Sequence, residues 1–128
     1  MTHGDEPRAG YYRARLTKGG PWVGVQVYWG VPEINGEPQD RAPRWCIRVD
    51  GATDEIEIDR STGYRCRVAL NVYRYWPWIG REEITEAEYR YMVDYARWAK
   101  ASAPERPEAS PRSPVKLAEM KAILPPPR

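Results

Sequence analysis

The sequence predicts an α+β fold, because short runs of period-two alternation are followed by one capped helix and a proline-rich end. Apolar and polar residues alternate in five runs between residues 11 and 72, which is the pattern of strands with one buried face. The period becomes helical at residue 85. We therefore expect about five antiparallel strands in a curved sheet or small open barrel, one capped C-terminal helix, and a Pro-rich tail with a short helix.

The clearest pair of strands covers residues 11–16 and 22–29, joined by a turn at Gly19-Gly20-Pro21. In the second strand one face should hold Val23, Val25, Val27 and Trp29, and the other Trp22, Gly24, Gln26 and Tyr28. Residues 30–43 form a long connection with an Asn35-Gly36 turn signal. A connection of this length is either a functional loop or a loop without regular structure.

Three further strands follow this connection. The first alternates through Trp45, Ile47 and Val49, and the second, residues 55–59, has an acidic outer face. The third should turn inward Tyr64, Cys66, Val68, Leu70 and Val72. Both cysteines, Cys46 and Cys66, are expected as buried free thiols, with a disulfide between neighbouring strands as the alternative.

A capping box marks the start of the helix. Thr85 is the expected N-cap and Glu88 the N3 residue, and the helix should run to about Ala101, before Pro104. The stripe that should pack on the sheet consists of Tyr89, Met92, Val93, Ala96 and Lys100. A second stripe, on the opposite side, consists of Tyr91, Tyr95 and Trp98.

The composition divides the chain into three parts. Residues 1–10 are expected as a flexible N-terminal arm, 11–101 as a single α+β domain and 102–128 as a Pro-rich tail folding back on that domain. Within the tail, Ser113-Pro114 can begin a short helix. Its apolar face, formed by Leu117, Met120 and Leu124, would cover the second helix stripe. The alternative occupant of that stripe is a protein partner.

Charge and composition exclude several function classes. The net charge is +2, so total charge favours no partner class, and from the apolar pattern we expect neither a membrane span nor a secretory signal. The only histidine is His3, so we expect no catalytic triad, no zinc site and no cofactor. A carboxylate–metal hydrolase is a weak alternative that would use Asp50, Asp54, Glu55, Glu57 and Asp59.

The amino-acid composition suggests a contact surface. Phe is absent, Trp and Tyr number 6 and 9, and most basic residues are arginine. Arginines and aromatics are interleaved between residues 60 and 81, without an acid. Stacking aromatics beside arginine is how proteins grip single strands. The candidate residues for nucleic-acid or partner binding are Arg65, Arg67, Tyr73, Arg74, Tyr75, Trp76 and Trp78. The alternative is that the aromatics are core and the arginines are ordinary solvated charges.

From Gly80 onward the chain carries a recurring pattern: Gly-Arg, then Ile-Thr-Glu-Ala-Glu-Tyr at residues 84–89, Trp98-Ala99, Ala103-Pro104 and a closing run of prolines. In this pattern, and in residues 11–29 and 40–45, the chain resembles a group of small bacteriophage and prophage proteins. It departs from that group with Ser110 in place of Asn and with Arg128 at its end. The resemblance implies a small accessory protein made in the host cytoplasm, and no catalytic residues.

Together these observations predict a non-enzymatic binding protein that docks on a nucleic-acid-handling or host-defence complex, as CRISPR inhibitors do. A protein partner is expected. Direct binding of single-stranded nucleic acid is the alternative, and a membrane partner is not expected. The sequence leaves the oligomeric state open.

Overall fold

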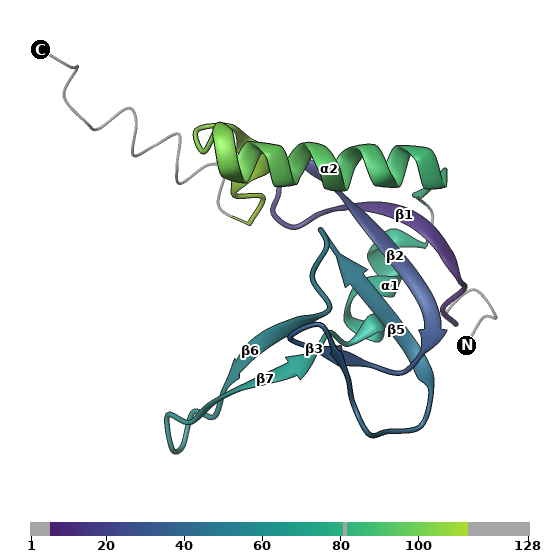
Figure 1. The fold of residues 1–128 in the computed structure, drawn as a ribbon, viewed down its shortest axis with the longest axis vertical. Helices are drawn as coiled ribbons and strands as arrows, with labels where there is room; N and C mark the ends of the chain where they lie inside the picture. The colour runs from purple at the N-terminus through teal and green to yellow at the C-terminus, as the bar shows by residue number, and fades with distance from the viewer. Residues whose placement is uncertain (1–5, 81, 113–128) are drawn as a thin grey trace, which may run out of the picture.

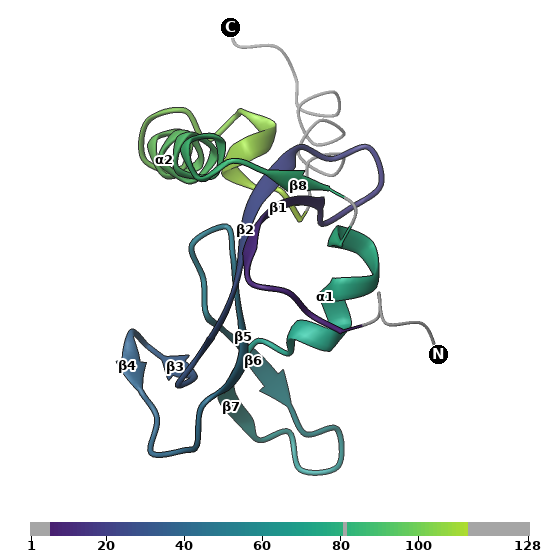
Figure 2. The same cartoon turned by 90° about the vertical axis from the view of Figure 1, so that its right-hand side faces the viewer.

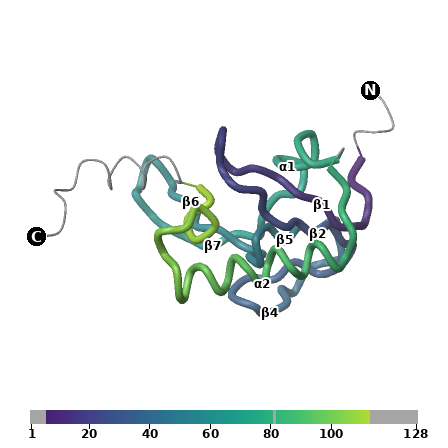
Figure 3. The backbone as a smooth tube through the Cα atoms, turned by 90° about the horizontal axis from the view of Figure 1, so that it is seen from above, coloured from purple at the N-terminus to yellow at the C-terminus, as the bar shows by residue number. Residues whose placement is uncertain are grey.

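The α+β class is confirmed by the computed structural model, which describes residues 6–80 and 82–112. A four-stranded antiparallel sheet lies between two helices, and two small hairpins extend from it (Figures 1–3). The order of strands in the sheet is β5-β2-β1-β8. Their bounds are β1 Gly10–Arg15, β2 Trp22–Gly30, β5 Arg44–Val49 and β8 Glu83–Ile84.

One face of the sheet is the main core. Pairing sets Tyr12 opposite Val25 and Val25 opposite Val49, so these side chains share a face. Figure 3 shows α1, residues Val72–Ile79, on one side of the sheet and α2 on the other. The buried residues of α1 that join this core are Val72, Trp76 and Ile79.

The helix α1 corrects the predicted strand, which was expected to continue to residue 72 and beyond. Asn71 is the N-cap, and its side chain accepts a hydrogen bond from the backbone N–H of Tyr73 at 3.0 Å. The residues at positions 72, 76 and 79 fall on one helical face, and burying that face outweighs the strand preference of the aromatic residues. The helix tolerates Pro77 and ends at Ile79.

The opposite face of the sheet is covered by α2, residues Glu86–Ser102. Its N-cap is Thr85, whose hydroxyl accepts a hydrogen bond from the N–H of Glu88 at 3.1 Å, so the predicted N-cap is confirmed; the Glu88 carboxylate contacts the Thr85 hydroxyl at 3.3 Å rather than the backbone N–H of a full capping box. The helix approaches β2 closely at Gly24, where a Cβ atom would lie 3.1 Å from the Tyr89 ring. Of the predicted inward stripe, Lys100 is exposed and forms an ion pair with Asp50 at 2.8 Å.

A four-stranded sheet and two small hairpins stand in place of the predicted five-stranded curved sheet, and the described residues form no closed barrel. The strands β3 (Glu33–Ile34) and β4 (Glu37–Pro38) enclose the Asn35-Gly36 turn, with φ of 55° and 77°. The strands β6 (Asp54–Ile58) and β7 (Arg65–Ala69) pair only with each other. They project from the body at the end remote from α2 (Figures 1 and 2).

The described part of the Pro-rich tail, up to Arg112, lies against α2. Ala103 is buried, and a 3₁₀ turn, Pro107–Ala109, contacts the helix. The hydroxyl of Thr17 donates a hydrogen bond to the Pro111 carbonyl at 3.4 Å. The predicted short helix and its face of Leu117, Met120 and Leu124 lie outside the described residues.

The predicted N-terminal arm is described from residue 6 onward. Pro7 is buried, and the Arg8 carbonyl accepts a hydrogen bond from the Tyr12 hydroxyl at 2.9 Å. This end of the N-terminal segment is therefore held against the body. In the part of the chain that the structure describes, neither helix has the length and apolar character that a membrane crossing requires.

Candidate functional site

The hairpin of β6 and β7, which we call the arm, exposes apolar side chains on both of its faces. Register places Ile56 opposite Arg67 and Ile58 opposite Arg65, so these four residues share one face. Ile56 and Ile58 are 53% and 51% exposed, and Tyr64 is 68% exposed. The predicted inward placement of Tyr64 is therefore wrong, because nothing among the described residues covers this part of the hairpin.

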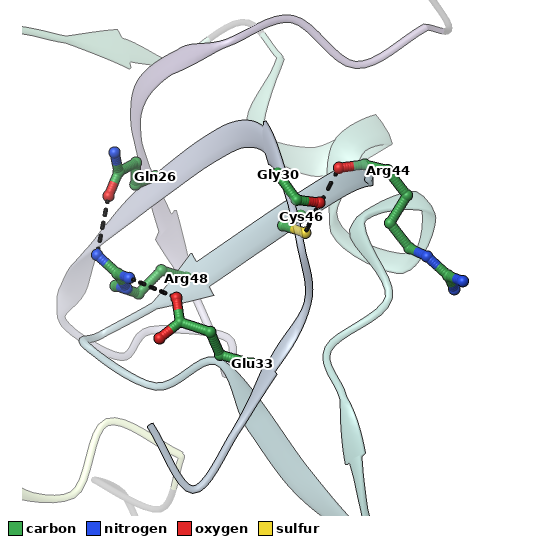
Figure 4. A network of polar contacts seen from close by, with 6 residues as sticks. All are labelled: Gln26, Gly30, Glu33, Arg44, Cys46 and Arg48. Atoms are coloured by element: carbon green, nitrogen blue, oxygen red, sulfur yellow. Dashed lines mark hydrogen bonds and ion pairs between the residues drawn. The ribbon is translucent and has the colours of Figure 1, made fainter. Parts of the chain in front are cut away.

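Cys66 also lies on the arm and is exposed, which corrects its predicted burial, whereas Cys46 is buried as predicted. Both are free thiols. Cys46 donates to the carbonyls of Gly30 and Arg44 at 3.3 and 3.5 Å (Figure 4). Burial is the main reason that the pKa of the Cys46 thiol lies above its ordinary value. Of the two thiols, Cys66 is therefore the one accessible to reagents.

Ion pairs hold the base of the arm. The Asp54 carboxylate accepts hydrogen bonds from the Asn35 backbone N–H at 2.6 Å and from the Arg67 guanidinium at 3.0 Å. Arg74 on α1 pairs with Glu55 at 3.0 Å. These contacts link the arm to the β3–β4 hairpin and to α1. The predicted candidates Arg67 and Arg74 thus have a structural partner each, whereas Arg65 is exposed.

Beside the arm, an open pocket of about 530 Å³ has mainly apolar walls. Trp29 and Trp45 meet edge to face in it, with ring centroids 5.4 Å apart. The pocket is also lined by Leu70, between β7 and α1, and by the predicted candidate Tyr73. Trp29 was expected on the inward face and is instead 61% exposed. The pocket is therefore a second exposed apolar feature, and it reaches the base of the arm at Ala69.

One polar network fixes this end of the sheet. Arg48 donates to Gln26 at 3.2 Å and pairs with Glu33 at 3.5 Å, while its guanidinium lies 5.5 Å from the centre of the Tyr28 ring (Figure 4). Every charged group in this network has a partner, so we assign it a structural role.

The aromatic candidates on α1 are separated by the helix. Trp76 is 3% exposed and packs edge to face on Tyr12, so its predicted place on a binding face is wrong. Trp78 is 81% exposed, and Tyr73 is also exposed. Tyr75 is half-buried against the core. The predicted Arg/aromatic strand face therefore does not exist as one surface.

The second predicted group stays together. Tyr91, Tyr95 and Trp98 form a ladder along the outer face of α2, with ring centroids 6.1 and 5.7 Å apart. Arg106, from the tail, donates to the Tyr95 hydroxyl at 3.0 Å, and its guanidinium lies 5.8 Å from the Trp98 ring centre. The tail thus contacts this stripe through an arginine, and Tyr91 and Trp98 remain exposed.

Sequence reasoning missed the residues beside this ladder. The guanidinium groups of Arg13 and Arg15 lie 4.2 and 4.4 Å from the centre of the Trp22 ring. Trp22 and Arg15 line a pocket of about 530 Å³ together with Tyr91 and Tyr95. The register of the β1–β2 hairpin, which sets Arg15 opposite Trp22, was the available signal.

The acidic residues do not converge on a metal site. Asp50 and Asp54 each pair with a basic residue, and Asp59 accepts hydrogen bonds from the Ser61 N–H and hydroxyl. Those Ser61 hydrogen bonds lower the pKa of the Asp59 carboxyl. Within residues 6–80 and 82–112, no three His, Cys, Asp or Glu residues are grouped so as to hold a metal ion.

A comparison with known proteins finds no matching family model, no matching curated sequence and no matching solved structure.

Proposed function

We propose that the protein is a non-enzymatic binding protein of the phage accessory kind, which acts in the host cytoplasm and docks on a protein partner through the arm. The partner would belong to a nucleic-acid-handling or host-defence complex. The observation that carries this proposal is the exposed apolar surface of Ile56, Ile58 and Tyr64 on a projecting hairpin.

A hairpin of two strands has little stability in water by itself. About half of the surface of Ile56 and of Ile58 is exposed to solvent, and that half contributes nothing to the core. Covering that half with a partner would contribute about 1 kcal/mol for each side chain. Exposed apolar groups on an element with a poor internal core are therefore best explained by a partner that buries them.

The arm is ordered before any partner binds. Its base is fixed by the Asp54 contacts and by the Arg74–Glu55 pair. Preorganisation of this kind lowers the entropic cost of association. The neighbouring Trp29–Trp45 pocket is open, mainly apolar and suited to one apolar or aromatic side chain of the partner.

Affinity capture from host cells tests the proposal when it compares three forms of the tagged protein. The arm variant carries Ile56→Asp and Ile58→Asp. The control variant carries Ala87→Asp and Ala101→Asp, which add the same charge at two exposed alanines on α2, away from the arm and its pocket. We expect one stoichiometric protein with the wild type and the control, and at least a tenfold loss with the arm variant.

Binding of the purified partner, measured by calorimetry, then separates a direct contact from an indirect one. If a folded arm variant binds the partner as well as the wild type does, the arm is not the docking surface. Chromatography with light scattering on the protein alone checks whether the arm instead joins two copies of the chain.

A further inference from the structure

The structure joins two groups of residues that are far apart in the sequence into one surface. Arg15, at the end of β1, lines the pocket formed with Trp22, Tyr91 and Tyr95, and it also lines a second hollow of about 360 Å³. The second hollow is formed with Tyr75, Trp78, Arg74 and Arg112. We call the two hollows, with Trp98 and Arg106 at one end, the arginine–aromatic track.

The charges of the track are unbalanced. Arg15, Arg106 and Arg112 form no ion pair within the described residues, whereas Arg13 pairs with Glu82 and Arg74 pairs with Glu55. The one carboxylate that lines either hollow is Glu108. Its Oε2 atom is buried without a hydrogen-bond partner, and the three arginines that form no ion pair outnumber this single carboxylate.

Three rings of the track are exposed, those of Tyr91, Trp98 and Trp78, and the rings of Tyr95, Tyr75 and Trp22 are partly exposed. Tyr91 and Tyr95 are nearly parallel, at 21°, and Trp98 continues the ladder. Trp78 lies at the other end and is the most exposed large apolar residue described. A series of accessible rings, flanked by guanidinium groups that form no ion pair, matches a ligand that carries both flat rings and negative charges.

We propose that the arginine–aromatic track binds single-stranded nucleic acid, with bases stacked on the exposed rings and phosphates on the unpaired arginines. Stacking requires bases that are free of a duplex, so a single strand fits this surface better than a double helix does. An acidic protein would satisfy the arginines but would leave the ring ladder without a matching partner. The track meets the arm at the Arg74–Glu55 pair but uses none of the exposed apolar residues of the arm, so this inference does not depend on the proposed function.

Fluorescence anisotropy with a labelled oligothymidylate of about 20 nucleotides tests the proposal. With three phosphate contacts the slope of log K against log salt should be about −2, which is roughly a 20-fold loss of affinity between about 50 and 200 mM salt. Removing Arg15 and Arg106 together, by alanine substitution, should reduce the magnitude of this slope by about 1.4.

Matched variants show whether oligonucleotide binding depends on the residues of the track or only on the positive charge of the protein. Arg60→Ala with Arg65→Ala removes the same charge from the arm and should leave binding unchanged. Tyr91→Ala with Trp98→Ala should weaken binding by about 5- to 150-fold for each stacked base that is lost. Glu108→Gln removes the nearby carboxylate and should strengthen binding.

Four results would overturn the proposal: no binding at low salt, equal loss with the arm control, equal affinity for duplex, or full displacement by polyglutamate. The last would assign the track to an acidic protein surface. A weaker affinity of Glu108→Gln for the oligonucleotide would also count against the proposal, because it would mean that the carboxylate does not repel the ligand. Thermal unfolding of each variant confirms that a loss of binding is not a loss of fold.

Discussion

The close packing of α2 on the sheet depends on Gly24, and replacing it with alanine should destabilise the protein. The added Cβ would lie 3.1 Å from Tyr89 Cδ1, 3.3 Å from the Tyr89 carbonyl oxygen and 3.3 Å from Val93 Cγ2. The Tyr89 ring could rotate, but its carbonyl belongs to the helix backbone. The helix must therefore move away from β2 as a unit.

The size of the effect follows from two opposing contributions. Overpacking of this kind costs about 1–3 kcal/mol. Alanine recovers about 0.5–1 kcal/mol, because glycine loses more conformational entropy on folding. We expect a net loss of about 1–2 kcal/mol in the free energy of unfolding, with a fall in Tm of about 4 °C for each kcal/mol in a chain of 128 residues.

Urea unfolding followed by far-UV circular dichroism measures the effect, and Gly30→Ala is the matched control. Gly30 lies in the same strand, and a Cβ there would meet only the Tyr28 side chain, at 3.3 Å, which can adjust. The control should change stability by less than about 0.5 kcal/mol. The double variant Gly24→Ala, Val93→Ala should show a coupling free energy of about 0.5 kcal/mol or more, because the Cβ added at position 24 would touch the Val93 side chain.

The reasoning is wrong if Gly24→Ala is as stable as the wild type or if its loss equals that of Gly30→Ala. A coupling of zero with Val93 would also refute the assigned contact. A changed urea m-value would mean that the substitution altered the compactness of the folded or unfolded state, and the comparison would then require hydrogen exchange across α2.

Three further predictions follow from single contacts. Thr85→Ala should cost about 1 kcal/mol in urea unfolding, because the N-cap hydrogen bond of α2 is lost, and Thr85→Ser should restore it. A maleimide at pH 8 should modify Cys66 in the folded protein and both thiols in urea, since Cys46 is buried and its pKa is raised; modification of folded Cys66→Ser would contradict this. Burial raises the pKa of Tyr12 and Tyr89 above 10.0, so folding favours their neutral forms. Their contribution to stability should be complete below pH 10 and lost as the pH rises through the raised pKa values, and a flat stability between pH 9 and 12 would refute it.

Much of the fold was predictable from local patterns. The alternation in residues 11–29 and the N-cap at Thr85 each determine one element without help from distant contacts, and both predictions are confirmed. The helix α1 was not predictable in this way. Its residues are mostly strand formers and include Pro77, and only their burial at positions 72, 76 and 79 reveals the helical period.

The site was less predictable than the fold, because alternation shows which residues share a face but not whether that face is covered. Tyr64 follows the same rule as Tyr12, yet Tyr12 meets a helix and Tyr64 meets solvent. The joining of Arg15 to the stripe on α2 depends on how the helix crosses the sheet. No spacing in the sequence encodes that crossing.

The arrangement of the two surfaces allows both proposed partners to bind at once. The arm projects at one end of the molecule, and the ladder of Tyr91, Tyr95 and Trp98 lies on α2 at the other (Figures 1 and 2). Because Arg74 is held by Glu55 of the arm and also lines the track, it is the one described contact through which the two sites could influence each other. Replacing Glu55 with Gln would release Arg74 to the track without removing an apolar group from the arm. Stronger binding to oligothymidylate with unchanged partner capture would show that the two surfaces act independently, whereas a loss of both would show that the arm positions the track.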